Sequence, residues 1–194
     1  MLKIFMQEIE KFARENMVQD FLHGWSHIER VLKYASIINR GVNANWDIIK
    51  SAILLHDIGY GKDREKHHEI SAVLAEEFLL TKEIDQDIIS NIKHCIISHS
   101  RQFAKEKPLS KEAQVVFDAD GMDLFGPIGL MRALLSCTLR NQEFECILKK
   151  LEWRLQECKN FYNKESKIFV AENSTIIKTY LFRLKKQLEF FKGL

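Results

Sequence analysis

The stretch from Ala52 to Gly61, AILLHDIGYG, indicates how this chain folds. Its first four residues are apolar, and together with the preceding residues they place apolar side chains at helical spacing on one face. His56 and Asp57 follow at the end of this helix, and the two glycines of GYG stop it. The sequence therefore predicts a buried helix whose end delivers an imidazole and a carboxylate to a glycine turn.

The same helical spacing recurs along nearly the whole chain, so we predict an all-α fold. Only 8 Gly and 2 Pro are present, and no stretch alternates apolar and polar residues as a strand does. Ser26 and Glu29 form a capping-box pattern, which predicts a helix that starts at His27. The other predicted helices span Trp46–Asp57, with Asn45 or Asp47 as its cap, His67–Leu80, Asp85–His99, a segment after Ser110, Gly129–Leu139, Gln142–Cys158 and Ser166–Lys192.

The chain's 194 residues, 46% of them hydrophobic, suit one compact helical bundle. All seven histidines lie in residues 1–140, whereas residues 141–194 are rich in Lys, Glu and Phe. We predict a core made of residues 1–140, with the helices of residues 141–194 packed on the same domain. The amphipathic helix that begins at Ser166 is expected to pack on this core, with a homodimer contact as the alternative.

Charge and composition exclude several classes of protein. Lys+Arg 29 against Asp+Glu 27 gives a net charge of +2, too even for a strong nucleic-acid binder. No apolar run approaches the length of a bilayer span, and acidic residues interrupt the N-terminal segment, so we expect a cytoplasmic protein. The four cysteines include no CxxC pair, and we expect free thiols.

Histidine and aspartate occur at the ends of three apolar helices. His27 begins one helix, His56 and Asp57 end another, and Asp118 and Asp120 end the stretch AQVVFDADGMDLFG. Burying an ionised Asp beside an imidazole is costly without a compensating cation, and a divalent metal ion would supply one. Imidazole and carboxylate without thiolate favour Mn²⁺, Fe²⁺, Co²⁺, Ni²⁺ or Mg²⁺. The alternative is a plain helical scaffold with incidental histidines, since a single histidine is more often structural.

The ordered segments GWSHIERV, LLHDIGY, HHEISA, IISHS and FDADGMDLFG resemble the HD-domain superfamily of metal-dependent phosphohydrolases. The resemblance covers about residues 20 to 135 and is strongest to small stand-alone bacterial members described as predicted HD-superfamily hydrolases. It implies a compact helical bundle of the HD-domain type that holds a divalent metal ion. Carried over by position, the implied metal ligands are His27, His56, Asp57 and Asp120, with Asp118 as the alternative to Asp120.

The resemblance also implies catalytic and substrate-binding residues. His68 and His99 match positions that bind a second metal ion or the substrate in HD proteins, and Asp57 is the implied catalytic carboxylate. His23, His67 and His94 are the more dispensable neighbours, although His23 lies one helical turn before His27. The substrate's phosphate charge is expected to be met by Arg30, Lys62 and Arg64, with Lys66 nearby in the segment GYGKDREKHH. A solvated basic loop is the alternative for this segment.

The expected activity is metal-dependent hydrolysis of a phosphate ester or anhydride. The expected substrate is a small phosphorylated molecule, foremost a nucleoside or deoxynucleoside triphosphate that is split to monophosphate and pyrophosphate. The alternative is a non-catalytic sensor module that binds a metal ion or a nucleotide.

Overall fold

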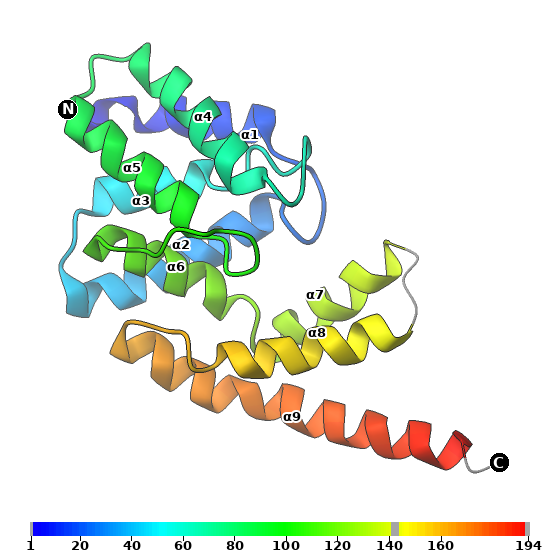
Figure 1. Ribbon diagram of the computed structural model, residues 1–194. Coiled ribbons are helices and arrows are strands. Elements are labelled where there is room, and N and C mark those ends of the chain that lie inside the picture. The colour runs from blue at the N-terminus through cyan, green and yellow to red at the C-terminus, as the bar shows by residue number, and fades with distance from the viewer. Residues whose placement is uncertain (1, 141–143, 193–194) are drawn as a thin grey trace. The chain divides into compact units, whose positions relative to one another are not determined.

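The computed structural model describes residues 2–140 and 144–192. Within these ranges the chain is all-helical, with one short 3-10 helix at the start and no strand (Figure 1). The prediction of an all-α fold is confirmed. The elements are η1 (Leu2–Phe5), α1 (Met6–Asn16), α2 (Trp25–Val42), α3 (Trp46–Leu55), α4 (His67–Leu80), α5 (Gln86–Ser98), α6 (Lys111–Met122), α7 (Gly126–Thr138), α8 (Phe144–Glu157) and α9 (Lys164–Lys192).

The helices group into two compact units, residues 1–120 and 121–194. This grouping places α7 with α8 and α9, whereas the sequence predicted a division near residue 140. The packing of the C-terminal helices on the core stays a prediction.

Helix α3 is the central element of the first unit, where it contacts α1, α2, α4 and α5. Its side chains at Ile49, Ile53 and Leu55 are fully buried. Burying each such side chain contributes roughly 1.5–3 kcal/mol, so α3 anchors the core. Because α3 is held on several sides, the two residues that follow it, His56 and Asp57, have a fixed and buried position.

The starts of α3 and α2 show which of the predicted helix caps form. The Asn45 side chain accepts the backbone N–H groups of Asp47 and Ile48, which confirms Asn45 as the cap of α3. The capping box predicted at Ser26 does not form. Helix α2 instead begins at Trp25 after Gly24, whose N–H donates to Asp20 O at 3.1 Å. A Cβ at Gly24 would lie 2.3 Å from that same oxygen, so the close turn requires glycine and starts the helix two residues early.

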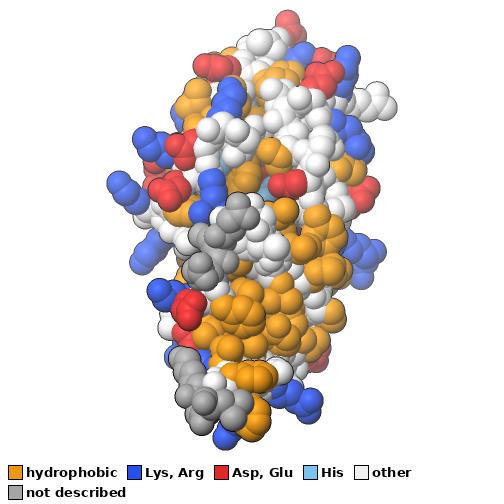
Figure 2. All heavy atoms as spheres, turned by 90° about the vertical axis from the view of Figure 1, so that its right-hand side faces the viewer, with side chains coloured by type: hydrophobic (Ala, Val, Ile, Leu, Met, Phe, Trp, Pro, Cys, Tyr) orange, Lys and Arg blue, Asp and Glu red, His pale blue; other side chains and the backbone are white. Residues whose placement is uncertain are grey.

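The second unit consists of α7, α8 and α9, which contact one another. Leu151 of α8 and Val170 and Ile177 of α9 are buried. Large apolar side chains of α9 such as Phe182 and Phe190 are exposed, and Figure 2 shows hydrophobic side chains gathered on one part of the surface. The homodimer contact stays a prediction. Among the described residues, no helix combines the length and the apolar character that crossing a membrane requires.

The cysteines differ in part from expectation. Cys137 and Cys146 form a disulfide in the second unit, so the expectation of four free thiols is wrong for this pair. Their Cα atoms lie 6.2 Å apart, a separation that a disulfide spans. Cys95 and Cys158 are free, as expected.

Candidate metal centre

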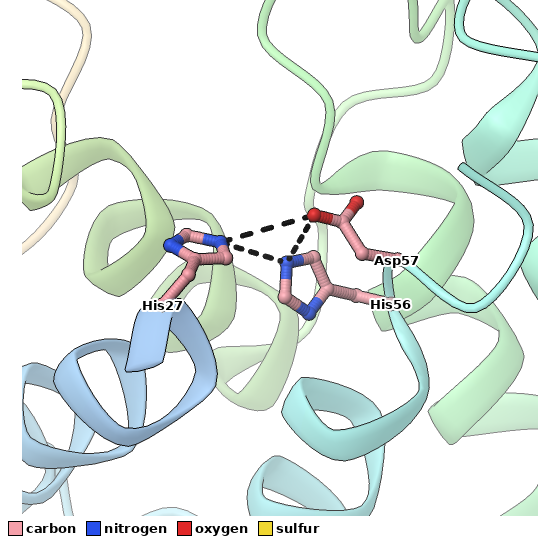
Figure 3. Close-up of side chains that lie close together, drawn as sticks. All are labelled: His27, His56 and Asp57. Atoms are coloured by element: carbon pink, nitrogen blue, oxygen red, sulfur yellow. Dashed lines mark hydrogen bonds and ion pairs between the residues drawn. The ribbon is translucent and has the colours of Figure 1, made fainter. Parts of the chain in front are cut away.

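The ends of three helices of the first unit meet at one buried point. His27 lies in the first turn of α2, His56 and Asp57 directly follow α3, and Asp120 lies near the end of α6. His27 Nε2 is 3.3 Å from His56 Nε2 and 3.3 Å from Asp120 Oδ1. Asp57 Oδ2 is 3.4 Å from His56 Nε2 and 3.9 Å from His27 Nε2 (Figure 3). Four potential ligands from three separate parts of the sequence thus point toward one another.

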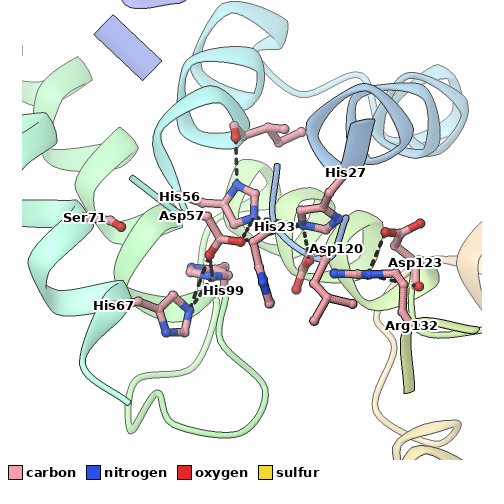
Figure 4. Close-up of polar contacts among 12 residues, drawn as sticks. His23, His27, His56, Asp57, His67, Ser71, His99, Asp120, Asp123 and Arg132 are labelled. Carbon is pink, nitrogen blue, oxygen red and sulfur yellow. Dashed lines mark hydrogen bonds and ion pairs between the residues drawn. The ribbon is translucent and has the colours of Figure 1, made fainter. Parts of the chain in front are cut away.

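A second group of donors shares Asp57. The other oxygen of this carboxylate, Oδ1, is 3.6 Å from His67 Nε2 and 3.6 Å from His99 Nε2. The two imidazole Nε2 atoms are 3.2 Å apart (Figure 4). His67 is the first residue of α4 and His99 follows α5, so the helices packed against α3 supply this group. Asp57 therefore lies between two histidine pairs and presents one oxygen to each.

Backbone carbonyls fix which nitrogen of three rings faces the cluster. The Nδ1 atoms of His56, His67 and His99 donate to the carbonyls of Ile53, Arg64 and Ile96, respectively, at 2.6–2.7 Å. In a neutral ring the proton is then on Nδ1, and Nε2 carries a lone pair. Hydrogen bonds of this kind orient metal-binding imidazoles in proteins. When it is neutral, each of these rings presents an acceptor nitrogen to the cluster.

The pKa shifts of these groups favour a bound cation. Burial lowers the pKa of His56 to about 4 and that of His67 to about 4. Burial opposes ionisation of Asp57, but His56, His99 and His67 outweigh it and hold its pKa well below the ordinary value. Asp120 likewise stays ionised, since His27 outweighs the effect of burial on its pKa. At neutral pH the cluster thus contains two carboxylates and at least two neutral imidazoles.

His99 differs from the other two rings. Burial lowers its pKa, but Asp57, Asp120 and the hydrogen bond to the Ile96 carbonyl together outweigh burial, so the net shift of the pKa is upward. A protonated His99 can donate to the Nε2 of His67, whereas two neutral rings would face each other as acceptors. The 3.2 Å pair therefore needs a cation, either a proton on one ring or a metal ion bound by both.

The donor set fits a divalent metal ion. His27, His56 and Asp57 have donor atoms within 4.8 Å of one another, and so do Asp57, His67 and His99. All of these side chains are buried, and they offer nitrogen and oxygen donors without thiolate. Such ligands suit Mn²⁺, Fe²⁺, Co²⁺, Ni²⁺ or Mg²⁺.

The structure separates two pairs of neighbouring candidates. Asp120 faces His27, whereas Asp118 lies 3.9 Å from Arg101 Nη2. Of the two adjacent histidines at the start of α4, His67 joins the cluster. His68 lies with its Nε2 3.9 Å from the exposed carboxylate of Glu69.

The basic residues expected to meet the substrate's phosphate lie in different environments. Lys62 is exposed and Arg30 is half-buried on α2. Arg64 lies over the ring of Phe103, with its guanidinium carbon 5.3 Å from the ring centre. The Phe103 ring contacts His67 edge-on at 6.3 Å between centres, so Arg64 is linked through one side chain to the cluster.

Sequence reasoning left His67 without a role and did not single out Tyr60. A signal for His67 exists, because the dipeptide His67-His68 offers two imidazoles at a helix start. Both side chains are buried, and the sequence alone does not say which of them faces the cluster.

Comparison with known proteins agrees with the resemblance. A family model described as HD domain matches residues 24–124. The uncharacterised protein YpgQ of Bacillus subtilis is 32% identical over 116 residues, which are 58% of this chain and 56% of YpgQ. In that alignment the chain thus spans little more than half the length of its relative.

Solved structures share the fold. A Lactobacillus plantarum protein aligns with a TM-score of 0.81 and 21% identity over 96% of this chain and 97% of its own. YpgQ in complex with ADP aligns with a TM-score of 0.74 and 21% identity over 94% and 97% of the two chains. An HD-superfamily hydrolase of Bacillus thuringiensis aligns with a TM-score of 0.72 and 19% identity over 97% and 99%. With a family model that matches more than half of its residues, this chain belongs to the HD-domain family.

Proposed function

We propose that the protein is a metal-dependent phosphohydrolase that acts on a nucleotide. The observation that carries this proposal is the Asp57 carboxylate, which lies between two buried histidine pairs whose nitrogens approach to 3.2–3.3 Å. Membership of the HD-domain family and the solved complex of the relative YpgQ with ADP support the hydrolase class and a nucleotide ligand.

In this proposal His27, His56, Asp57 and Asp120 hold a divalent metal ion. When bound, such an ion lowers the pKa of a water molecule and polarises a phosphoryl oxygen. The chain's own residues supply the geometry. Asp57 is held by the end of α3, and its Oδ1, which faces His67 and His99, would orient the attacking water on that side. His67 and His99 lie on that side of Asp57, where they bind a second cation or contact the substrate phosphate.

Two sequence-based assignments are revised in this proposal. His67 replaces His68 as the partner of His99, because only His67 faces Asp57. Among the basic residues, Arg64 has the strongest claim to a phosphate contact, because its partner Phe103 touches His67. Arg30 and Lys62 stay candidates for the same role.

The leading reaction is hydrolysis of a nucleoside or deoxynucleoside triphosphate. Water adds to the α-phosphorus, the bond to the bridging oxygen breaks, and the products are the monophosphate and pyrophosphate. In this proposal the acceptor nitrogens and carboxylates of the cluster would hold a metal ion, and its positive charge would stabilise the negative charge that develops on the phosphoryl group.

The second candidate is a non-catalytic module that binds a metal ion and a nucleotide. The same buried ligands would serve it, and the relative's complex with ADP fits it equally well. It differs from the enzyme in one measurable respect, since it binds nucleotides without releasing phosphate or pyrophosphate.

A screen of metal ions against nucleotides tests the proposal. Metal-stripped protein is supplied with each candidate ion and a panel of nucleoside mono-, di- and triphosphates, and released phosphate and pyrophosphate are measured. The Asp57→Asn variant keeps the shape of the side chain and removes its charge, so it is expected to lose turnover. Asp87→Asn, an exposed position in the first turn of α5, is the matched control. Equal turnover by the wild type and Asp57→Asn would refute the mechanism, and nucleotide binding without turnover would favour the sensor module.

A further inference from the structure

A histidine and a tyrosine stack beside the metal-binding cluster without belonging to either group of ligands. The rings of His23 and Tyr60 are 3.7 Å apart between centres, with an interplanar angle of 21°. Each of these two rings also contacts one histidine of the cluster. His23 meets His27 edge-on at 6.3 Å, and Tyr60 meets His67 edge-on at 5.5 Å. Figure 4 draws His23 among the site residues.

The loop before α2 holds His23 in place. Asp20 Oδ1 accepts the backbone N–H groups of Leu22 at 2.8 Å and of His23 at 2.6 Å. Asp20 Oδ2 lies 3.8 Å from His23 Nδ1, and the His23 side chain is the main cause that lowers the pKa of Asp20 to about 2. The tight approach of Gly24 to Asp20 closes this loop. The Asp20 carboxylate thereby fixes the backbone at Leu22 and His23, and it places a negative charge near His23 Nδ1.

The turn after Asp57 holds Tyr60 equally firmly. The Tyr60 N–H donates to Asp57 O at 3.0 Å. The preceding Gly59 donates its N–H to Ser71 Oγ at 2.9 Å, and a Cβ at Gly59 would lie 2.8 Å from the backbone of α4. On the other side of Tyr60, a Cβ placed at Gly61 would lie 3.0 Å from the Val18 side chain. These contacts fix the backbone at Tyr60, from which its ring stacks on His23.

The position of His23 suits contact with a substrate. Its side chain keeps 18% of its surface exposed, whereas those of His27 and Asp57 are 1% and 5% exposed. It lies near enough to Asp57 to be among the groups that lower the pKa of that carboxyl. An imidazole offers an N–H that can donate to an anion, and stacking and the Asp20 loop fix its ring before any ligand arrives.

We propose that His23 is a substrate-binding residue that donates a hydrogen bond to a phosphate oxygen of the nucleotide, and that Tyr60 is the positioning residue that holds its ring. This inference rests on the proposed function, since it assigns a further residue to the same site. It separates the roles of His23 and His27, which lie one helical turn apart in the sequence: His27 binds the metal ion and His23 the phosphate.

The test measures binding of inorganic pyrophosphate to the Mn²⁺-loaded 194-residue chain by calorimetry. His23→Phe keeps a ring to stack on Tyr60 and removes the N–H donor. A hydrogen bond to a charged group contributes enough to shift an affinity about tenfold to hundredfold, so we expect the dissociation constant to rise within that range. Mn²⁺ affinity and the thermal midpoint are measured on the same samples and are expected to stay at wild-type values.

Further variants separate positioning from folding. Tyr60→Leu removes the stacking ring and is expected to weaken pyrophosphate binding, whereas Tyr60→Phe is expected to restore it. His23→Asn provides a second variant in case His23→Phe folds poorly. His94→Gln is the control, because the Nε2 of His94 accepts the backbone N–H of Leu109 and takes no part in the cluster.

The outcomes are distinct. If the wild type binds pyrophosphate in an Mn²⁺-dependent way and His23→Phe binds it equally well, the inference is wrong and the proposed function stands. If His23→Phe loses Mn²⁺, His23 acts on the metal ligands, and its assignment to phosphate is also wrong. If the wild type itself shows no Mn²⁺-dependent pyrophosphate binding, the phosphate site beside the cluster is wrong and this inference fails, whereas the turnover screen decides the proposed function separately.

Discussion

The adjacent histidines at the start of α4 allow a sharp test of the site. We compare His67→Gln with His68→Gln, two neighbouring substitutions that each remove one imidazole and keep a polar side chain. His67 Nε2 lies 3.2 Å from His99 Nε2 and 3.6 Å from Asp57 Oδ1. His68 Nε2 lies 3.9 Å from Glu69, whose side chain is 61% exposed. The structure therefore predicts that the two variants behave differently.

The magnitudes follow from these surroundings. Losing a group that binds or orients a metal ion typically costs about 10–100-fold in metal affinity or activity, which is roughly 1.4–2.8 kcal/mol. We expect a loss of this size in His67→Gln. His68 Nε2 faces an exposed carboxylate outside the cluster at 3.9 Å, so His68→Gln is expected to change turnover and Mn²⁺ affinity by less than about fivefold, which is about 1 kcal/mol.

The assay is Mn²⁺ titration and nucleotide turnover of both variants and the wild type, with thermal melting as a check on folding. Burial lowers the pKa of His68, so that ring is neutral in the folded protein and its replacement leaves no buried charge without a partner. A large loss in His68→Gln together with wild-type behaviour of His67→Gln would refute the assignment of His67 to the cluster.

Three further predictions concern the scaffold. Ile53→Ala opens a cavity beneath the site and is expected to lower the free energy of unfolding by about 2–5 kcal/mol, measured by denaturant titration. Asp20→Asn is expected to cost about 1 kcal/mol at pH 7 after allowance for solvent screening. The folded pKa of Asp20 is about 2 and its ordinary value is 3.8, so its stabilisation is present above about pH 4 and is lost as the pH falls toward 2. Equal melting midpoints of Asp20→Asn and the wild type at pH 7 would contradict this. Alkylation of the unfolded protein without reductant is expected to label Cys95 and Cys158, and reduction is expected to expose Cys137 and Cys146 as well. Labelling of all four without reductant, read by mass spectrometry, would show that the disulfide is not formed.

The centre of the fold could be predicted from sequence because its signals are local and agree with one another. The apolar face of α3, the Asn45 cap and the glycines after Asp57 all indicate one buried helix. The sequence predicts its end at Asp57, whereas α3 ends at Leu55 with His56 as the C-cap. The ends of α2 and α6 could likewise be assigned residues with metal-binding chemistry, and the structure brings His27 and Asp120 to the same point.

Other features depend on contacts that the sequence does not show. Asp118 and Asp120 are two positions apart on a helix, so they face in different directions, and only packing against Arg101 and His27 shows which is which. The capping pattern at Ser26 is a valid local signal, but the close turn at Gly24 starts the helix earlier.

Partners that are distant in the sequence account for the remaining differences. The role of His67 depends on its contact with His99, 32 positions later in the chain. The disulfide depends on how α7 and α8 pack, which the spacing of the cysteines does not reveal. Sequence spacing thus identified which residue types could form a metal centre, and tertiary packing determined which members of neighbouring pairs join it.

The central claim is that Asp57 and the surrounding histidines bind a divalent metal ion. Titration of Mn²⁺ into metal-stripped protein tests it directly, with wild type, Asp57→Asn and Asp87→Asn measured side by side. We predict at least one tightly bound ion per chain in the wild type and in Asp87→Asn, and an affinity at least about 100-fold weaker in Asp57→Asn, since that carboxylate contacts both histidine pairs. No tight binding in the wild type, or equal binding by Asp57→Asn, would contradict the account.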